Sequence, residues 1–386
     1  MADLGIVQNA ALLTDGNGDI VFAGSSPLPD LPGDVRTIDA GGRCVTPGLI
    51  DSHAHLVFAG NRAGEFYRRC AGESYADIAR AGGGIMSTVE ATRAATEDEL
   101  VESALLRLRR MAQNGTTTVE IKSGYGLTPG DEAKMLRATN RLYEAAGVNT
   151  FATYMGAHAI PPEYANGRAD YIAQVALSIV NFADEGLMDF VDIFVDPLAF
   201  TQAEADKLTP VVRKAGLGLK IHGDEFANNG TAAWAVQRGA VSVDHLGGIS
   251  REGISSLAAS NTVATLLPGT MLFSGHGKFA PARRMIDAGC AVALATDLNP
   301  GSSHVYSLPM VMTLACLHMG MTAAECLTAC TINAAHALRA ADRIGSLEPG
   351  KRADLVIWDC DSYEQIPYYV GTNLARTVIC GGRVLT

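Results

Sequence analysis

Residues 46–62 read "TPGLIDSHAHLVFAGNR", and the expected architecture follows from this segment. An apolar run ends in His53 and His55, and Arg62 follows seven residues after the second histidine. In a β-strand, residues i and i+2 point to the same side, so both imidazoles project together from the end of the strand. The segment therefore predicts a buried strand whose end carries a candidate metal site.

Seven more segments have the same nearly continuous apolar character, which is typical of parallel strands buried on both faces. With the first, they are residues 43–53, 116–123, 149–158, 189–197, 217–225, 240–248, 261–269 and 290–300. The segments between them have apolar residues at helical spacing, for instance residues 97–115 and 201–216, and are predicted to be helices. Eight strands that alternate with helices predict a (β/α)₈ TIM-like barrel. A doubly wound open sheet is the competing architecture, but it explains less well why polar residues end so many strands.

The two ends of the chain have a different pattern, with short candidate strands and glycine-rich turns in residues 6–14, 18–24, 35–42, 345–359 and 376–386. We expect these ends to meet in one small composite β-sandwich domain formed by residues 1–46 and 346–386. The barrel would then occupy residues 47–345. Because no Pro/Ser/Gly-rich linker separates the two parts, we expect them to pack tightly against each other.

The composition excludes several classes of protein. The 386 residues are 48% hydrophobic and 18% charged, with a net charge of −11 and no basic run. This excludes a disordered chain and argues against a nucleic-acid partner. No apolar stretch of about 20 residues could span a membrane, and the start has no secretory signal pattern. We expect a cytoplasmic protein with its eight cysteines reduced. An anionic substrate would need a local cation.

Three more strand segments end in side chains that can ligate a metal. His222 and His245 close two of them, and Asp297 closes the last. Active sites of (β/α)₈ barrels lie at the C-terminal ends of the strands, so these side chains should meet His53 and His55. Nitrogen and oxygen donors without cysteine favour zinc or a similar divalent ion. We expect one ion per chain, with His245 either as a ligand or as a group that orients water.

Two charged residues near these strand ends are open to different interpretations. Glu225 lies three residues after His222, where it could contact water or substrate or be a solvated loop carboxylate. Arg62 could bind a substrate carboxylate with two hydrogen bonds, or it could be an ordinary surface charge.

Several longer segments resemble the imidazolonepropionase family within the amidohydrolase superfamily, whose general pattern is an H-x-H pair, two later histidines and a late aspartate on a barrel. Besides residues 46–62, they are "YADIARAGGGIMSTVEATRAAT" (75–96), "TTVEIKSGYGL" (117–127), "GAHAIPPEY" (156–164), "ALATDLNPGSS" (293–303) and "RIGSLEPGKRADLVIWD" (343–359). They are spread over nearly the whole chain. The resemblance implies hydrolysis of the ring C–N bond of 4-imidazolone-5-propanoate to N-formimidoyl-L-glutamate, in histidine degradation.

The same resemblance implies roles for individual residues and for cofactors and partners. One zinc or iron ion would be held by His53, His55, His222 and Asp297, with His245 nearby but not a ligand. The catalytic residues would be Glu225, His245 and Asp297. Substrate contacts would fall on Arg62, Tyr125, His158, Glu225, Asn299, Gly301 and Ser302. Either Glu225 or Asp297 would carry the proton, and a homodimer is expected.

Two other functions remain as alternatives at this point. A second amidohydrolase activity, such as deamination of a heterocycle, would use the same metal ligands. Arg62, Tyr125 and His158 argue against it, because a neutral base needs no anchor for a carboxylate. A non-catalytic barrel is the second alternative, and it should have lost one or more of the ligands, all of which are present.

Overall fold

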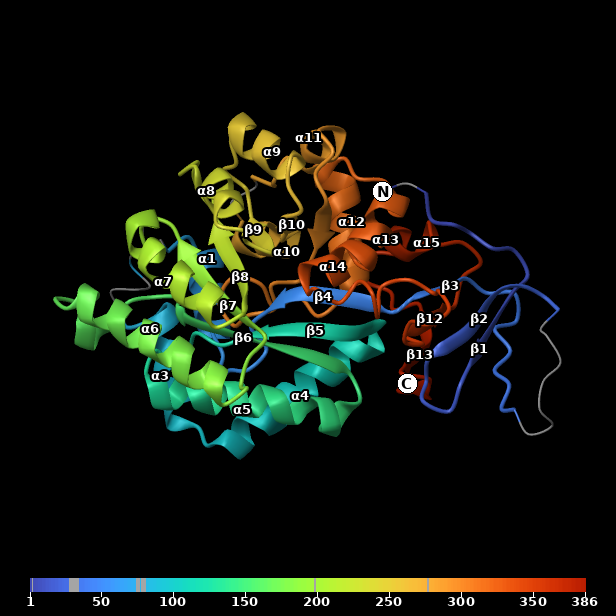
Figure 1. The fold of residues 1–386 in the computed structure, drawn as a ribbon, viewed down its shortest axis with the longest axis horizontal. Helices are drawn as coiled ribbons and strands as arrows, with labels where there is room; N and C mark the ends of the chain where they lie inside the picture. The colour runs from blue at the N-terminus through green and yellow to red at the C-terminus, as the bar shows by residue number, and fades with distance from the viewer. Residues whose placement is uncertain (2, 28–34, 74–76, 78–80, 198, 276–277) are drawn as a thin grey trace.

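The computed structural model describes residues 1, 3–27, 35–73, 77, 81–197, 199–275 and 278–386. An eight-stranded sheet with consecutive strands side by side and parallel forms its centre (Figure 1). The strands are β4 (Leu49–Ala54), β5 (Thr116–Lys122), β6 (Asn149–Ala157), β7 (Phe190–Val195), β8 (Gly218–Gly223), β9 (Ser242–His245), β10 (Val263–Leu266) and β11 (Val292–Leu294). Each of the eight segments predicted as barrel strands overlaps with one of these strands.

The sheet closes into a ring just beyond β11. The backbone N–H of Asp297 donates to the carbonyl of His53 at 3.0 Å, and the N–H of His55 donates to the carbonyl of Leu298 at 2.8 Å. These two bonds join the last strand to the first and confirm the TIM-like barrel. They also place the H-x-H pair directly beside the late aspartate.

Helices cover the outside of the ring (Figure 1). The helices predicted over residues 97–115 and 201–216 are confirmed as α4 and α7, and Thr96 and Thr201 begin them with capping boxes. The helices are α1 (Ala63–Cys70), α3 (Ile85–Ala94), α4 (Glu97–Gln113), α5 (Pro129–Ala146), α6 (Arg168–Asp184), α7 (Gln202–Lys214), α8 (Thr231–Gln237), α9 (Arg251–Ala258), α10 (Pro268–Ser274), α11 (Ala282–Asp287), α12 (Leu308–Met319), α13 (Ala323–Ala329), α14 (Ile332–Ala337) and α15 (Gln365–Tyr368), with a 3₁₀ turn at Pro162–Tyr164.

Two antiparallel sheets are built from the ends of the chain. One pairs β1 (Ala10–Thr14) with β2 (Ile20–Ser25). The other has the order β14 (Arg383–Val384), β13 (Ala375–Cys380), β12 (Leu355–Trp358) and β3 (Val45–Pro47). Leu12 packs against a small cluster of Leu355, Ile357 and Ile379, so the two sheets share apolar contacts.

Two details differ from the sequence prediction. Residues 43–53 are not one strand, because β3 joins the C-terminal sheet and β4 begins the barrel. Gly48 separates them, and a Cβ there would lie 2.1 Å from Thr117 Oγ1, so the chain can turn between the sheets only at a glycine. Residues 35–42, predicted as a strand, form none in the structure.

The C-terminal sheet packs directly on the base of the barrel. Trp358 is fully buried, and its indole N–H donates to Thr46 Oγ1 at 2.8 Å. Gly115 has a φ of 95°, and a Cβ there would lie 2.9 Å from the Trp358 ring. This contact fixes the start of β5 against β12. Among the described residues, no helix is long and apolar enough to cross a membrane.

Candidate metal and catalytic site

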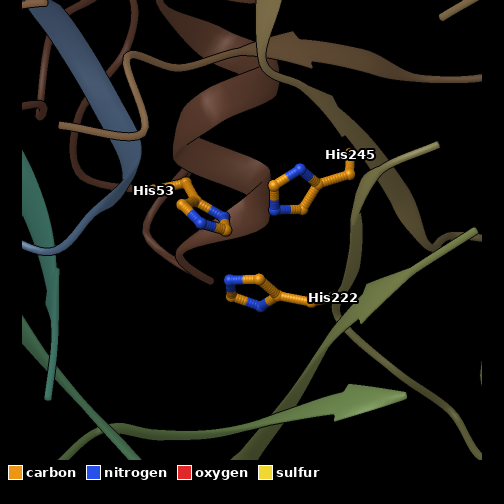
Figure 2. Close-up of side chains that lie close together, drawn as sticks. All are labelled: His53, His222 and His245. Carbon is orange, nitrogen blue, oxygen red and sulfur yellow. The ribbon is translucent and has the colours of Figure 1, made fainter. Parts of the chain in front are cut away.

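Four histidines and one aspartate from four strands converge at the C-terminal mouth of the barrel. Figure 2 shows the rings of His53, His222 and His245 turned toward one another. Ligand atoms of these three residues lie within 4.8 Å of one another, and so do those of His53, His55 and Asp297. The two groups share His53. The structure therefore brings together all five residues that end the predicted strands.

Buried carboxylates fix the orientation of two of these rings. Asp244 Oδ2 lies 2.6 Å from His53 Nδ1, and Asp192 Oδ1 lies 2.9 Å from His222 Nδ1. Each imidazole that donates through Nδ1 presents an unprotonated Nε2, which is the tautomer a metal ligand needs.

The unpaired nitrogens of the cluster test whether a metal ion suits it. His53 Nε2 and His55 Nδ1 are buried, and neither makes a hydrogen bond with any described residue. Buried polar atoms are nearly always paired in folded proteins. His53 Nε2 is unpaired and faces the Asp297 carboxylate at 3.4 Å, which is an arrangement that suits a bound cation. The donor set suits a divalent metal ion.

Asp297 supplies the only carboxylate of the two ligand groups. Its Oδ1 lies 3.4 Å from His53 Nε2 and 3.7 Å from His55 Nε2. Its Oδ2 accepts a 2.6 Å hydrogen bond from the hydroxyl of Thr270 on α10. One oxygen thus faces the imidazoles, and the other is held by the scaffold.

Burial dominates the protonation of the site. It lowers the pKa of His53, His55 and His245 well below the usual value, so these rings are neutral. It raises the pKa of Asp297 to about 6. Neutral imidazoles and a carboxylate that ionises near neutral pH are the forms that bind a cation.

His245 and Glu225 face each other on the rim. His245 Nδ1 lies 3.4 Å from Glu225 Oε1, and Glu225 is 9% exposed. Burial, together with the charge of Asp297, raises the pKa of Glu225 well above its usual value. Glu225 is therefore not a solvated loop carboxylate, since it lies inside the site and can hold a proton there.

Backbone strain collects at these strand ends. Asp224, His245, Leu246 and Asp297 have φ values of 47°, 80°, 63° and 50°, in the left-handed region that side chains rarely adopt. Such strain persists where the surroundings impose it, and it often marks functional sites. Asp224 contributes by accepting the backbone N–H groups of Asn229, Thr231 and Ala232, which folds the loop that carries Glu225.

The aromatic rings of Tyr125 and His158 pack beside the ring of His55. The rings of His55 and His158 are stacked, with centroids 5.2 Å apart, and Tyr125 lies 5.8 Å from His55 and 5.5 Å from His158. His158 Nδ1 is 3.0 Å from the Gly124 carbonyl. Buried Glu132 accepts the N–H groups of Gly124, Gly126 and Leu127, which holds the Tyr125 loop in place.

Arg62 immediately precedes α1 and is held by a carboxylate of that helix. Glu65 Oε2 accepts from Arg62 Nε at 2.9 Å and from Nη2 at 2.8 Å. Glu65 Oε1 accepts from Gly84 N and Ser87 Oγ, so the same carboxylate also ties in the Gly82–Gly84 turn. Arg62 Nη1 lies against Gly301, where a Cβ would be only 2.0 Å away. The Arg62 side chain is 12% exposed and is not an ordinary surface charge.

Asn299 organises the loop after β11. Its Oδ1 accepts the backbone N–H of Gly301 at 2.8 Å and of Ser302 at 2.7 Å, and its amide donates to the Asp297 carbonyl at 2.7 Å. The hydrogen bonds of the Asn299 side chain thus stabilise the loop itself. Of the three substrate contacts predicted there, Gly301 is the one that lies against Arg62.

The sequence prediction missed the charged residues beneath the histidines. They are Glu120, Lys122, Asp192, Lys220 and Asp244, and all are fully buried. Their signal was present in "VEIK", "VDIF", "LKIH" and "VDH", where a charge recurs within an apolar strand.

Comparison with known proteins agrees with this geometry. Residues 44–385 match the amidohydrolase family. The chain is 47% identical to an imidazolonepropionase of Geobacillus kaustophilus and 45% identical to one of Bacillus velezensis, over 100% of this chain and 92% and 91% of theirs. It is 46% identical to the imidazolonepropionase of Rhizorhabdus wittichii over 98% of this chain and 95% of that one.

Solved structures share the fold at low identity. A 5-methylcytosine deaminase from Klebsiella pneumoniae, liganded with phosphonocytosine, superposes with a TM-score of 0.74 at 18% identity, covering 98% of this chain and 94% of that one. A zinc-bound adenosine deaminase from Xanthomonas campestris gives 0.72 at 18% identity, covering 97% and 88%. The full-length sequence matches, with the barrel and its histidine cluster, place this chain in the amidohydrolase family and, within it, among the imidazolonepropionases.

Proposed function

We propose that this protein is an imidazolonepropionase, which hydrolyses the ring C–N bond of 4-imidazolone-5-propanoate to N-formimidoyl-L-glutamate. The observation that carries the proposal is the position of Tyr125 beside His55 and of Arg62 against Gly301, in the loop that follows Asp297. Burial raises the pKa of the Tyr125 hydroxyl, and the charges of Asp297 and Arg62 also act on it. A substrate that has both a hydrolysable ring and a carboxylate matches this arrangement.

His53, His55, His222 and Asp297 would hold the metal, and nitrogen and oxygen donors suit zinc or iron. When bound, such an ion supplies Lewis-acid polarisation of the ring carbonyl and lowers the pKa of water. Asp244 and Asp192 keep His53 and His222 in the ligating tautomer. Thr270 holds the free oxygen of Asp297.

Arg62 would bind the substrate propionate. Glu65 holds its Nε and Nη2, and Nη1 remains on the side of Gly301, where a carboxylate can meet both the guanidinium and the loop after β11. The stacked His158 and the Tyr125 ring would hold the flat imidazolone beside His55. Anchoring the tail fixes the ring relative to the reacting groups.

Glu225 would carry the proton. Water adds to the ring carbonyl carbon, Glu225 takes the proton from that water, and His245 stabilises the developing oxyanion. Glu225 then delivers the proton to the ring nitrogen as the C–N bond breaks. The raised pKa of Glu225 supports this role, since a carboxylate that binds a proton more tightly than an ordinary one is a better base toward water and can then return the proton. Asp297 remains a ligand.

The activity is tested with metal-loaded protein and 4-imidazolone-5-propanoate, by following loss of the ring chromophore. A panel of cyclic amides and aminopurines is measured beside it. We expect turnover of the imidazolone and none of the aminopurines. Turnover of the panel without turnover of the imidazolone would identify another amidohydrolase activity and overturn the proposal.

The role of Arg62 is tested with an imidazolone whose side chain lacks the carboxylate. The wild-type protein should prefer the propionate over this analogue by a large factor, and Arg62→Gln should remove the preference by raising KM for the propionate only. Equal preference in both proteins would exclude Arg62 as the anchor. The homodimer and the cytoplasmic location stay predictions from the sequence.

A further inference from the structure

The layer beneath the histidine cluster is built from charges. Interiors of (β/α)₈ barrels are usually filled by branched aliphatic side chains. Here Glu120, Lys122, Asp192, Lys220 and Asp244 come from four strands, and none is exposed to solvent. Burying ions costs several kcal/mol for each, and replacing a buried ion network with apolar residues is often neutral or stabilising. Stability therefore does not explain these residues.

Lys122 lies at the centre of this layer. Its Nζ is 2.6 Å from Glu120 Oε1 and 2.7 Å from Asp192 Oδ2, and it is 3.6 Å from Asp244 Oδ2. Asp192 and Asp244 are the two carboxylates that hold His222 and His53. One ammonium group thus contacts both carboxylates that orient the candidate ligands.

Each of these carboxylates contacts both Lys122 and a histidine. Asp192 uses Oδ2 for Lys122 and Oδ1 for His222. Asp244 uses Oδ2 for both Lys122 and His53, and its Oδ1 has no hydrogen-bond partner among the described residues. Without the ammonium, the described polar contacts of the Asp192 side chain would be with His222 alone and those of Asp244 with His53 alone, so both carboxylates could rotate.

We propose that Lys122 is a positioning residue for the metal site. Its ammonium holds Asp192 and Asp244 in place through ion pairs at 2.7 and 3.6 Å. These two then keep His222 and His53 as Nδ1 donors with Nε2 facing the ion. The inference rests on the proposed metal site. Lys122 is not a catalytic residue, because it is fully buried beneath the histidines.

Lys220 is a matched control in the same layer. It is also fully buried, and its Nζ donates to Glu120 Oε2 and, at 3.0 Å, to the Ser52 carbonyl. Among the described ion pairs, it has none with Asp192 or Asp244. Lys220→Met and Lys122→Met each remove one buried ammonium from one network, but only the second removes contact with the carboxylates that hold the histidines.

The experiment measures zinc affinity by chelator competition in wild type, Lys122→Met and Lys220→Met, with folding checked by circular dichroism. Loss of groups that orient metal ligands typically weakens binding by about 10–100-fold. We expect a loss of that size in K122M and a clearly smaller one in K220M. Nitrogen NMR of the histidine rings without metal gives a second readout: Nδ1–H rings for His53 and His222 in wild type, and mixed tautomers in K122M.

Each outcome decides the question. Zinc binding by K122M as tight as that of wild type, or an equal loss in K220M, would overturn the proposal. If K122M does not fold, Lys122→Gln, which removes the charge but keeps a donor, is measured in the same way, and wild-type affinity in that variant would overturn it. Absence of zinc binding by wild type would instead refute the metal site itself.

Discussion

Thr270 Oγ1 donates a 2.6 Å hydrogen bond to Asp297 Oδ2, and both side chains are buried. Thr270 lies in the first turn of α10, which follows β10, whereas Asp297 follows β11. Two neighbouring strand ends are thus joined through the one carboxylate that faces His53 and His55. A hydrogen bond to a ligating carboxylate fixes which of its oxygens remains free for a metal.

Thr270→Val should therefore weaken metal binding and lower kcat/KM, by about 10–100-fold for the affinity. The change keeps the shape of the side chain and removes only its hydroxyl. Chelator competition and steady-state kinetics give the two values.

Thr265→Val is the matched control for this substitution. Thr265 lies on β10, is fully buried, and its hydroxyl has no hydrogen-bond partner in the described part of the chain. It should keep wild-type metal affinity. Equal losses in both variants would mean that the Thr270 hydrogen bond does not orient Asp297.

The sequence was sufficient to predict the barrel and the meeting of its strand ends. Parallel strands in one ring present their C-terminal ends at one mouth, so His53, His222 and Asp297 had to approach one another once the strands were recognised. The apolar runs were recognisable because both faces of each strand are buried.

Contacts between side chains from different elements could not be predicted in the same way. Lys122 and Lys220 lie in apolar strands, but which face of a strand points into a barrel depends on closure and register, which no local pattern records. The partner of Asp297, Thr270, comes from a helix 27 residues earlier. The pairing of Arg62 with Glu65 is local, at i and i+3 across the start of α1, and could have been recognised from that spacing.

Glu65→Gln should raise KM for the imidazolone about tenfold with little change in kcat. A less rigid Arg62 binds the substrate more weakly, and it does so to the same extent in the ground state and in the transition state. A tenfold change corresponds to about 1.4 kcal/mol, close to the lower end of the range for a charge-assisted hydrogen bond. Steady-state kinetics measure it.

The control is Glu73→Gln, which alters a similar two-bond pair with Arg68 at the exposed end of α1. Exposed pairs of this kind contribute little, so KM should not change. If Glu65→Gln lowered KM, Glu65 would be a competitor of the substrate carboxylate for Arg62, and the positioning role would be wrong.

Gly301→Ala should raise KM in the same way as Arg62→Gln, because the new Cβ would lie 2.0 Å from Arg62 Nη1 and must displace the guanidinium. The double variant should bind substrate no worse than Arg62→Gln alone, since both changes remove one interaction. Gly64→Ala in α1, where a Cβ would meet nothing within 4 Å, is the control. Additive losses in the double variant would place Gly301 outside the Arg62 site.

Removal of the metal should lower the thermal stability of the protein. An ion that binds only the folded state stabilises it by about 2.7 kcal/mol at a free concentration 100 times its Kd. Thermal melts of chelator-treated protein with and without added zinc should therefore show a higher Tm with the ion.

His53→Ala should abolish this increase in Tm, since His53 belongs to both candidate ligand groups. His336→Ala on α14 should retain it, because that side chain is exposed and far along the chain from the strand ends. The His336→Ala substitution removes an imidazole that does not belong to the cluster. A zinc-dependent Tm in His53→Ala as large as in wild type would place the ion elsewhere on the protein.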